Sequence, residues 1–232
     1  MESLKDIHPI AIAKLKKSFT LNPVPLKYPF PERPARALGL AKVDGDIFSA
    51  EKFSRVVFFR LDLPVYMAVR STFLRPRMEF DLPVFTAEIV VTGKRRMFMI
   101  DIHRTGESSK HDDSALFDKL IKIRDRYPAL LENKTTLNSE IQSVFSKAVC
   151  QVKITEDLDE QALSLFREYL EVFSEMVEKA VPLSGEALDK AKDAYTGYLK
   201  TVIDHDPGVK GYKMLFGKEG GTTRALDIFF TS

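Results

Sequence analysis

The second quarter of the chain alternates hydrophobic and polar positions, which predicts a series of β-strands. Residues 54–61 and 65–74 are rich in β-branched and aromatic side chains and are separated by a Pro-containing break at residues 62–64. Residues 82–104 hold two further alternating runs around a Thr-Gly-Lys sequence, which is the signal of a β-hairpin. Strands that follow one another at such short spacing predict an antiparallel sheet.

The predicted hairpin has two chemically different faces. A turn centred on Gly93 and Lys94 pairs Glu88 with Met99 and Thr86 with Asp101, and side chains alternate between the faces. One face is entirely hydrophobic and is expected in the core: Phe85, Ala87, Ile89, Val91, Phe98, Ile100 and Ile102. The other face carries Thr86, Glu88, Asp101 and His103 among Val84, Val90, Met97 and Met99. A mostly hydrophobic surface with two acids and a histidine is either exposed to solvent or forms the wall of a pocket.

Helical periodicity dominates the rest of the chain. It predicts helices over residues 10–19, over residues 114–127 with Pro128 as the stop, from Glu156 to just before Pro182, from a Ser184 cap to a break at residues 204–208, and in one or two short pieces up to Phe230. We expect an extended connector or edge strand at the Pro-rich residues 22–34 and a polar loop at residues 105–113. A further edge strand is expected at residues 148–154. The strand-rich and helical halves each have one hydrophobic face, so we expect one α+β domain over residues 1–232 with helices on a central antiparallel sheet.

Composition narrows the class of protein. The formal net charge of +2 is too small to indicate a nucleic-acid partner, and no hydrophobic run is long enough to span a bilayer. The N-terminus lacks the features of a signal peptide, and the single cysteine, Cys150, excludes an internal disulfide. We therefore expect a cytoplasmic protein with neither a nucleic-acid nor a membrane partner.

Common catalytic motifs are absent from the sequence. There is no Gly-rich phosphate loop, no GxSxG and no HExxH, and the four histidines show no metal-ligand spacing, so we expect no metal site. Two groups of residues remain. Glu88 among valines and methionines is either a general acid with a raised pKa or a solvent-exposed or ion-paired strand residue. The sequence Asp204-His205-Asp206-Pro207-Gly208, by itself, is typical of a helix end.

Several segments together resemble the ferredoxin-dependent bilin reductases. The upstream RSTFLRPRMEFDLP, the hairpin sequences DLPVFTAEIV and GKRRMFMIDI, and the C-terminal HDPGVKG, LFGKEGG and ALDIFF follow the order and spacing of that family over about residues 53–101 and 195–230. The resemblance implies a three-layer α/β/α sandwich with a central antiparallel sheet. It also implies a linear tetrapyrrole, biliverdin or a partly reduced bilin, between the sheet and the C-terminal helices. In that family no metal or flavin is bound, and electrons from reduced ferredoxin alternate with proton transfers through radical intermediates.

Carried over residue by residue, the resemblance implies roles for individual side chains. Glu88 falls where the family usually has a proton-donating Asp, Asp206 falls on a second catalytic Asp, and His205 replaces the Asn that precedes it. Ser71 falls where the phycocyanobilin-forming branch has a histidine, which disfavours that reaction, whereas Asp206 favours reduction of the A ring. Thr86 stands where a Gly is usual, so the chain is a divergent member.

The expected site is completed by residues near these positions. We expect catalytic roles for Glu88, Asp206 and His205, and substrate contacts from Ser71, Thr86, Met99, Asp101, Arg70 and Arg75, with Arg96 a further candidate for the propionates. Ferredoxin is expected at a basic rim, either Lys14, Lys16 and Lys17 or Lys94, Arg95 and Arg96 at the hairpin tip, and the protein is expected to be a monomer. The alternatives are a bilin- or haem-binding protein without turnover, a relative of the chlorophyll-catabolite reductases, or a purely structural interaction module.

Overall fold

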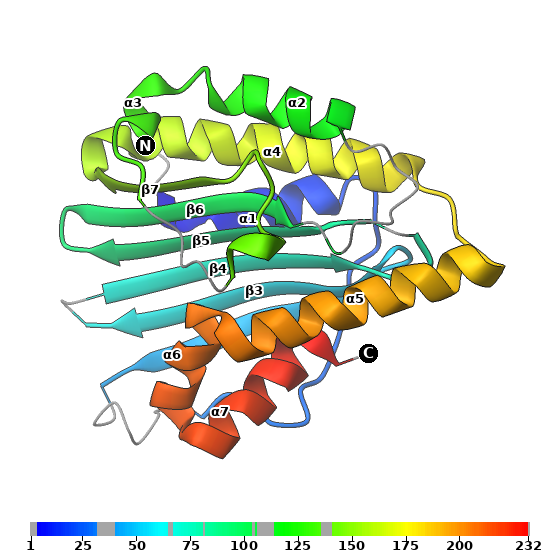
Figure 1. The fold of residues 1–232 in the computed structure, drawn as a ribbon. Helices are drawn as coiled ribbons and strands as arrows, with labels where there is room; N and C mark the ends of the chain where they lie inside the picture. The colour runs from blue at the N-terminus through cyan, green and yellow to red at the C-terminus, as the bar shows by residue number, and fades with distance from the viewer. Residues whose placement is uncertain are drawn as a thin grey trace.

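The computed structural model describes residues 4–31, 40–64, 67–80, 82–103, 105, 114–135 and 141–231. Of the segments predicted above, residues 32–34, 65–66, 104 and 106–113, with His111, lie outside this part of the chain. The described residues form an α+β fold of three layers, with helices on both faces of an antiparallel sheet (Figure 1). This confirms the predicted α/β/α sandwich.

The sheet has seven strands that pair in chain order, each antiparallel to the next. The strands are β1 (Asn22–Pro23), β2 (Lys42–Ser49), β3 (Phe53–Leu63), β4 (Met67–Pro76), β5 (Val84–Thr92), β6 (Arg95–His103) and β7 (Cys150–Thr155). The hairpin β5–β6 has the predicted register, with Glu88 opposite Met99 and Thr86 opposite Asp101. The predicted strand at residues 148–154 is β7, and it forms one edge of the sheet.

One face of the sheet is covered by four helices; in Figure 1, α2, α3 and α4 lie above the sheet and α1 lies behind the strands. They are α1 (Ile7–Leu15), α2 (Ser114–Arg124), α3 (Pro128–Leu131) and α4 (Asp159–Lys179). The hydrophobic face of the hairpin is buried here, and Phe85 packs against Phe166 and Phe173 of α4 at centroid distances of 6.0 and 5.3 Å. This layer is a closed hydrophobic core.

The opposite face is covered by the C-terminal part of the chain, which lies below the sheet in Figure 1. Its elements are α5 (Gly185–His205), α6 (Pro207–Phe216), α7 (Lys218–Ala225) and the π-helical turn η6 (Leu226–Phe230). Short 3-10 helices lie elsewhere in the chain: η1 (Leu4–Asp6), η3 (Met78–Phe80), η4 (Gln142–Val144) and η5 (Glu156–Leu158). None of the helices in the described ranges is long and hydrophobic enough to cross a membrane.

The structure corrects the bounds of the first two predicted helices, the first of which ends at Leu15 rather than near residue 19. The first helix begins at Ile7 rather than at residue 10, because Pro9 lies in its first turn, where the backbone N–H groups have no helical partner and proline is tolerated. Pro128 does not end the preceding helix, which already stops at Arg124, but begins α3. The predicted Ser184 cap occupies the N-cap position of α5 without a side-chain hydrogen bond.

Strand β2 is missing from the predicted sheet, which began at residue 53. Its Gly45 and two aspartates disfavour a strand by local propensity. Asp44 and Asp46 both accept hydrogen bonds from Arg60 of the neighbouring β3. At Gly45 a Cβ atom would lie 3.0 Å from the Phe58 carbonyl oxygen and 3.3 Å from the Phe30 ring, so the close approach of these groups requires glycine. Tertiary contacts thus override the local sequence signal.

Candidate active site

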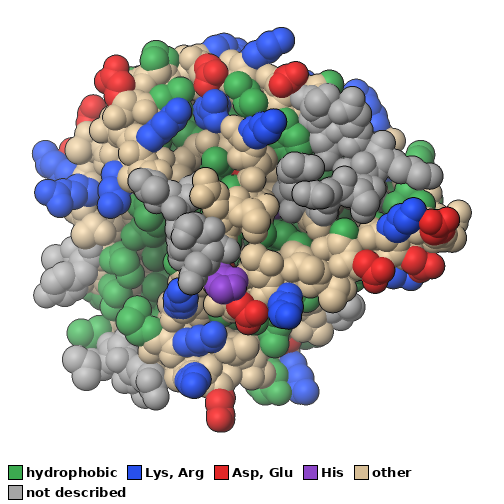
Figure 2. Space-filling model, in the orientation of Figure 1, with side chains coloured by type: hydrophobic (Ala, Val, Ile, Leu, Met, Phe, Trp, Pro, Cys, Tyr) green, Lys and Arg blue, Asp and Glu red, His purple; other side chains and the backbone are tan. Residues whose placement is uncertain are grey.

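A pocket lies between the mixed face of the sheet and the C-terminal helices. Its floor is formed by β4, β5, β6 and β7, and its roof by α5, α6 and η6 together with the segment before β7. The space between the lining side chains is about 1050 Å³, including the part open to solvent. In Figure 2, hydrophobic side chains are visible in a hollow on this side of the molecule, with Lys and Arg side chains around it. The mixed hairpin face is therefore the floor of a pocket.

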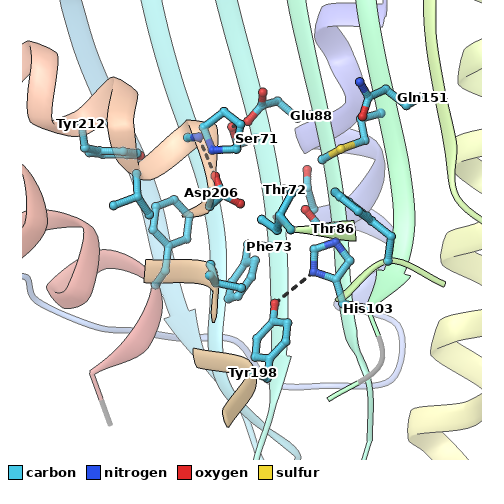
Figure 3. Close-up of a pocket in the computed structure, with 18 of the residues that line it drawn as sticks. Ser71, Thr72, Phe73, Thr86, Glu88, His103, Gln151, Tyr198, Asp206 and Tyr212 are labelled. Carbon is cyan, nitrogen blue, oxygen red and sulfur yellow. Dashed lines mark hydrogen bonds between the residues drawn. The ribbon is translucent and has the colours of Figure 1, made fainter. Parts of the chain in front are cut away.

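The lining brings distant parts of the sequence together. The sheet contributes Ser71, Phe73, Thr86, Glu88, Met97, Met99, His103 and Gln151, and the roof contributes Ile141, Phe145, Tyr198, Val202, Asp206, Val209, Tyr212, Phe229 and Phe230. Figure 3 shows side chains from β4 to β7 facing side chains from α5 and α6. Hydrophobic and aromatic groups predominate, with a few polar groups among them, as in most ligand pockets.

Glu88 is the carboxylic acid on the floor of the pocket. Its Oε2 accepts a hydrogen bond from the Ser71 hydroxyl at 3.3 Å, across the β4–β5 pair in which the two residues lie opposite each other. Burial, and then the nearby charge of Asp206, raise the pKa of Glu88 to about 7, while the Ser71 hydrogen bond opposes the shift. Glu88 therefore exists in comparable amounts as acid and base near neutral pH, as a general acid requires.

Asp206 faces Glu88 from the roof. It is the N-cap of α6, where its side chain accepts a hydrogen bond from the Gly208 backbone N–H at 2.5 Å. A Cβ atom at position 208 would lie 2.8 Å from the Asp206 carboxylate, so glycine leaves room for this bond. Burial raises the pKa of Asp206, although the hydrogen bonds from Gly208 and Val209 oppose the shift. The pocket thus contains two carboxyl groups that both hold protons more strongly than usual.

Five of the residues predicted for the site line the pocket: Glu88, Asp206, Ser71, Thr86 and Met99. The other four do not. His205 is the last residue of α5, next to Asp206. Arg70 donates to Asp62 and to the Val69 carbonyl, both at 2.8 Å. The structure thus places Asp101, Arg75, Arg70 and His205 outside the pocket lining.

Asp101 and Arg75 hold parts of the pocket wall. The buried Asp101 carboxylate accepts hydrogen bonds from the Ser146 backbone N–H, at 2.8 Å, and from its hydroxyl, which fixes the segment that contributes Phe145 to the lining. Burial raises the pKa of Asp101 to about 6. Arg75 donates to the Phe230 carbonyl at 2.5 Å and lies 5.4 Å from the Tyr195 ring. Both side chains are engaged by the protein itself.

Arg96, a further propionate candidate, is also engaged by the protein. It is 9% exposed and donates to Asp159 of α4 and to the Gly93 carbonyl. Arg96 therefore fixes the turn of the hairpin to the helical layer on the opposite side.

Five polar residues of the lining are not among the residues predicted for the site: Thr72, His103, Gln151, Tyr198 and Tyr212. Alternation placed His103 on the same face as Glu88, which could have singled it out. The tyrosines belong to the hydrophobic stripe of α5 and to α6, where nothing in the sequence distinguishes them from core residues. Tyr212 packs against Phe59 at 5.0 Å, and its buried hydroxyl has no hydrogen-bond partner among the described residues.

Comparisons of the sequence and of the fold with known proteins all match bilin reductases. The family profile described as "Ferredoxin-dependent bilin reductase" matches residues 9–226. Phycoerythrobilin:ferredoxin oxidoreductase of Prochlorococcus marinus (strain MIT 9312) is 22% identical over 187 residues, which are 78% of this chain and 73% of the relative. The enzyme of the same name from Gloeobacter violaceus is 22% identical over 209 residues, covering 88% of this chain and 85% of the relative. The crystal structure of tomato phytochromobilin synthase in complex with biliverdin matches with a TM-score of 0.83 at 21% identity, covering 97% of this chain and 80% of that one.

Proposed function

This chain belongs to the ferredoxin-dependent bilin reductase family, and we propose that it reduces a linear tetrapyrrole, biliverdin IXα or a dihydrobiliverdin, with electrons from ferredoxin. Members of the family are oxidoreductases that act on CH–CH groups with an iron–sulfur protein as donor. The names of the relatives support a bilin substrate, and the fold match is to a protein that holds biliverdin. The pocket, between the sheet and the C-terminal helices, suits a large and mainly hydrophobic ligand.

The observation that carries the mechanism is the pair of protonatable carboxyl groups in one pocket. Reduction of one C=C bond consumes two electrons and two protons, and reduced ferredoxin delivers the electrons one at a time through a radical intermediate. Glu88, with a pKa of about 7, is proposed to donate one proton to the bound bilin, and Asp206 to donate the second. The Ser71 hydroxyl orients the Glu88 carboxyl by its hydrogen bond. His205, which is not among the lining residues, is not assigned a proton transfer.

An anaerobic assay with biliverdin, reduced ferredoxin and an electron supply tests this function. We expect a shift of the bilin absorption with a transient radical signal by electron paramagnetic resonance, and chromatography identifies the product. Tight binding of biliverdin without any change of the pigment would instead identify a binding protein without turnover. Turnover of a chlorophyll-derived linear tetrapyrrole but not of biliverdin would identify a chlorophyll-catabolite reductase.

We propose that ferredoxin docks at the tip of the β5–β6 hairpin. Lys94, whose side chain is 84% exposed, and Arg95 lie at this turn, and the exposed Lys153 lies opposite the pocket residue Met97. The other basic group, Lys14, Lys16 and Lys17, belongs to the end of α1 on the opposite face, where Lys14 pairs with Glu171. Of these two basic groups, the hairpin tip is the one that lies beside the pocket, although Lys94 also pairs with Glu156 at 3.5 Å.

Reversing the charge at this tip should weaken the interaction with ferredoxin. In the double variant K94E/R95E we expect a KM for ferredoxin about 10-fold or more higher, with the effect decreasing at high salt because ions screen exposed charges. The matched control is K16E/K17E at the end of α1. Steady-state assays at two ionic strengths would contradict the docking site if the control raised KM and the hairpin variant did not. Bilin affinity should be unchanged in both variants.

A further inference from the structure

His103 lies at the end of the pocket farthest from Glu88 along the sheet. It is the last residue of β6 and pairs with Val84, whereas Glu88 pairs with Met99. Four residues of strand between Val84 and Glu88 correspond to about 13 Å. The His103 ring is 4% exposed and is enclosed by Phe145 at 5.1 Å and Tyr198 at 5.9 Å between ring centroids (Figure 3). The mechanism proposed above does not use this group.

Tyr198 is the hydrogen-bond partner of the His103 ring. The Tyr198 hydroxyl lies 3.0 Å from Nδ1 of the histidine ring (Figure 3). Burial raises the pKa of Tyr198 well above its usual value and lowers the pKa of His103 to about 3, so both side chains are uncharged at neutral pH. We assign the hydroxyl as the donor, because a phenol O–H is a stronger hydrogen-bond donor than a neutral imidazole N–H and an imidazole nitrogen is a stronger acceptor than a phenol oxygen. With this assignment the ring proton resides on Nε2.

The remaining ring nitrogen has no partner in the described part of the protein. Nε2 of His103 is buried without a hydrogen bond, and the Tyr212 hydroxyl of the same pocket is in the same situation. A buried donor left unpaired destabilises a protein, and such groups in native structures call for an explanation. A bound ligand with an acceptor oxygen at this end of the pocket would supply the missing partner.

We propose that His103 donates a hydrogen bond from Nε2 to a lactam carbonyl oxygen of the bound substrate and thereby sets which part of it lies beside Glu88 and Asp206. The inference rests on the proposed function, because a linear tetrapyrrole carries a lactam carbonyl on each terminal ring. A neutral acceptor is favoured over a propionate, since the imidazole is uncharged and no Lys or Arg is among the lining residues of the described chain. Holding one terminal ring about 13 Å from the acids fixes which double bond is reduced.

Equilibrium binding of biliverdin and of its dimethyl ester, followed by absorption, tests this contact. His103→Leu removes the donor and should weaken the binding of both ligands about 10-fold or more, whereas His103→Gln keeps an N–H donor and should recover most of the affinity. Tyr198→Phe keeps the aromatic ring but removes the hydroxyl that holds the ring proton of His103 on Nε2, and it should cause a smaller loss of affinity. Among the products formed by His103→Leu we expect a changed ratio of positional isomers.

The matched control is His8→Leu. His8 is also a buried histidine, 2% exposed, but it belongs to α1 on the opposite face of the sheet, where its ring lies 5.3 Å from Phe58. Its removal should leave bilin binding unchanged, and thermal unfolding shows whether each variant is folded.

Three outcomes would overturn the inference. Unchanged affinity and unchanged products in both His103→Leu and Tyr198→Phe would show that His103 does not contact the substrate. A loss with biliverdin but not with the dimethyl ester would assign the contact to a propionate. Failure of the unmodified protein to bind either ligand would overturn the proposed function itself, which the first two outcomes leave intact.

Discussion

Glu88→Gln is expected to lower the rate of bilin reduction by about 10²- to 10⁴-fold, the usual contribution of a general acid, while bilin affinity changes little. Glutamine has nearly the same shape as glutamate and can still accept the hydrogen bond that Ser71 donates to Glu88. It has no proton to give, so the reaction should stop after the first electron has entered. Single-turnover absorption and electron paramagnetic resonance should therefore show a radical that forms and persists.

Glu88→Asp provides the comparison for this variant. It keeps the acid but withdraws the carboxyl group by about one bond length, so the rate should fall less than in Glu88→Gln. Normal turnover in Glu88→Gln, with normal decay of the radical, would remove Glu88 from the mechanism. A loss of bilin binding would instead assign Glu88 to substrate recognition.

Asp206→Asn should lower the rate by about 100-fold or more and move the pH dependence of the remaining activity to lower pH. The negative charge of Asp206 contributes to the raised pKa of Glu88, so its removal lowers that pKa from about 7. Glu88 donates a proton only when protonated, and the fraction protonated falls as the pH rises through its pKa. The decline in rate with rising pH should therefore occur at a lower pH in the variant than in the unmodified protein.

The neighbouring Asp204→Asn is the control for this prediction. Asp204 is an exposed residue near the end of α5, whereas Asp206 lines the pocket. Asparagine is also a good N-cap, so Asp206→Asn should not unfold α6. Rate measurements from pH 6 to 9 would contradict the assignment if Asp204→Asn gave the larger loss, or if the two variants had the same pH profile.

Strand patterning predicted much of the pocket floor. The alternation in the hairpin is strict, so one register fits it, and that register placed Thr86, Glu88 and Met99 on one face. It also placed Asp101 there, but alternation defines only a face and not the partner of a side chain. The partner, Ser146, is 45 residues away in a segment with no regular pattern. Asp101 therefore supports the pocket wall in a way that the sequence did not reveal.

The roof of the pocket was harder to predict from sequence. Tyr198 and Tyr212 recur at helical spacing with ordinary core residues, and only the packing of α5 and α6 on the sheet turns them toward the pocket. Arg75 was expected to bind substrate because a cationic side chain near a ligand site suggests an anion. Its hydrogen bond to the Phe230 carbonyl joins residues 155 positions apart, which no local pattern encodes.

The chain-order pairing of the strands has a consequence for how the protein is made. From β2 to β6 each strand joins its predecessor through a short loop and at small entropic cost, whereas a long segment with α2 and α3 separates β6 from β7. The helices that roof the pocket are synthesised after the sheet, and η6 is fixed to β4 only when Phe230 reaches Arg75. Until then the sheet face with Val57 and Phe59 is open to water. This hydrophobic sheet face is thus the surface of the folding chain most prone to aggregation. Pulse-labelled hydrogen exchange during refolding should find α5 to η6 protected last.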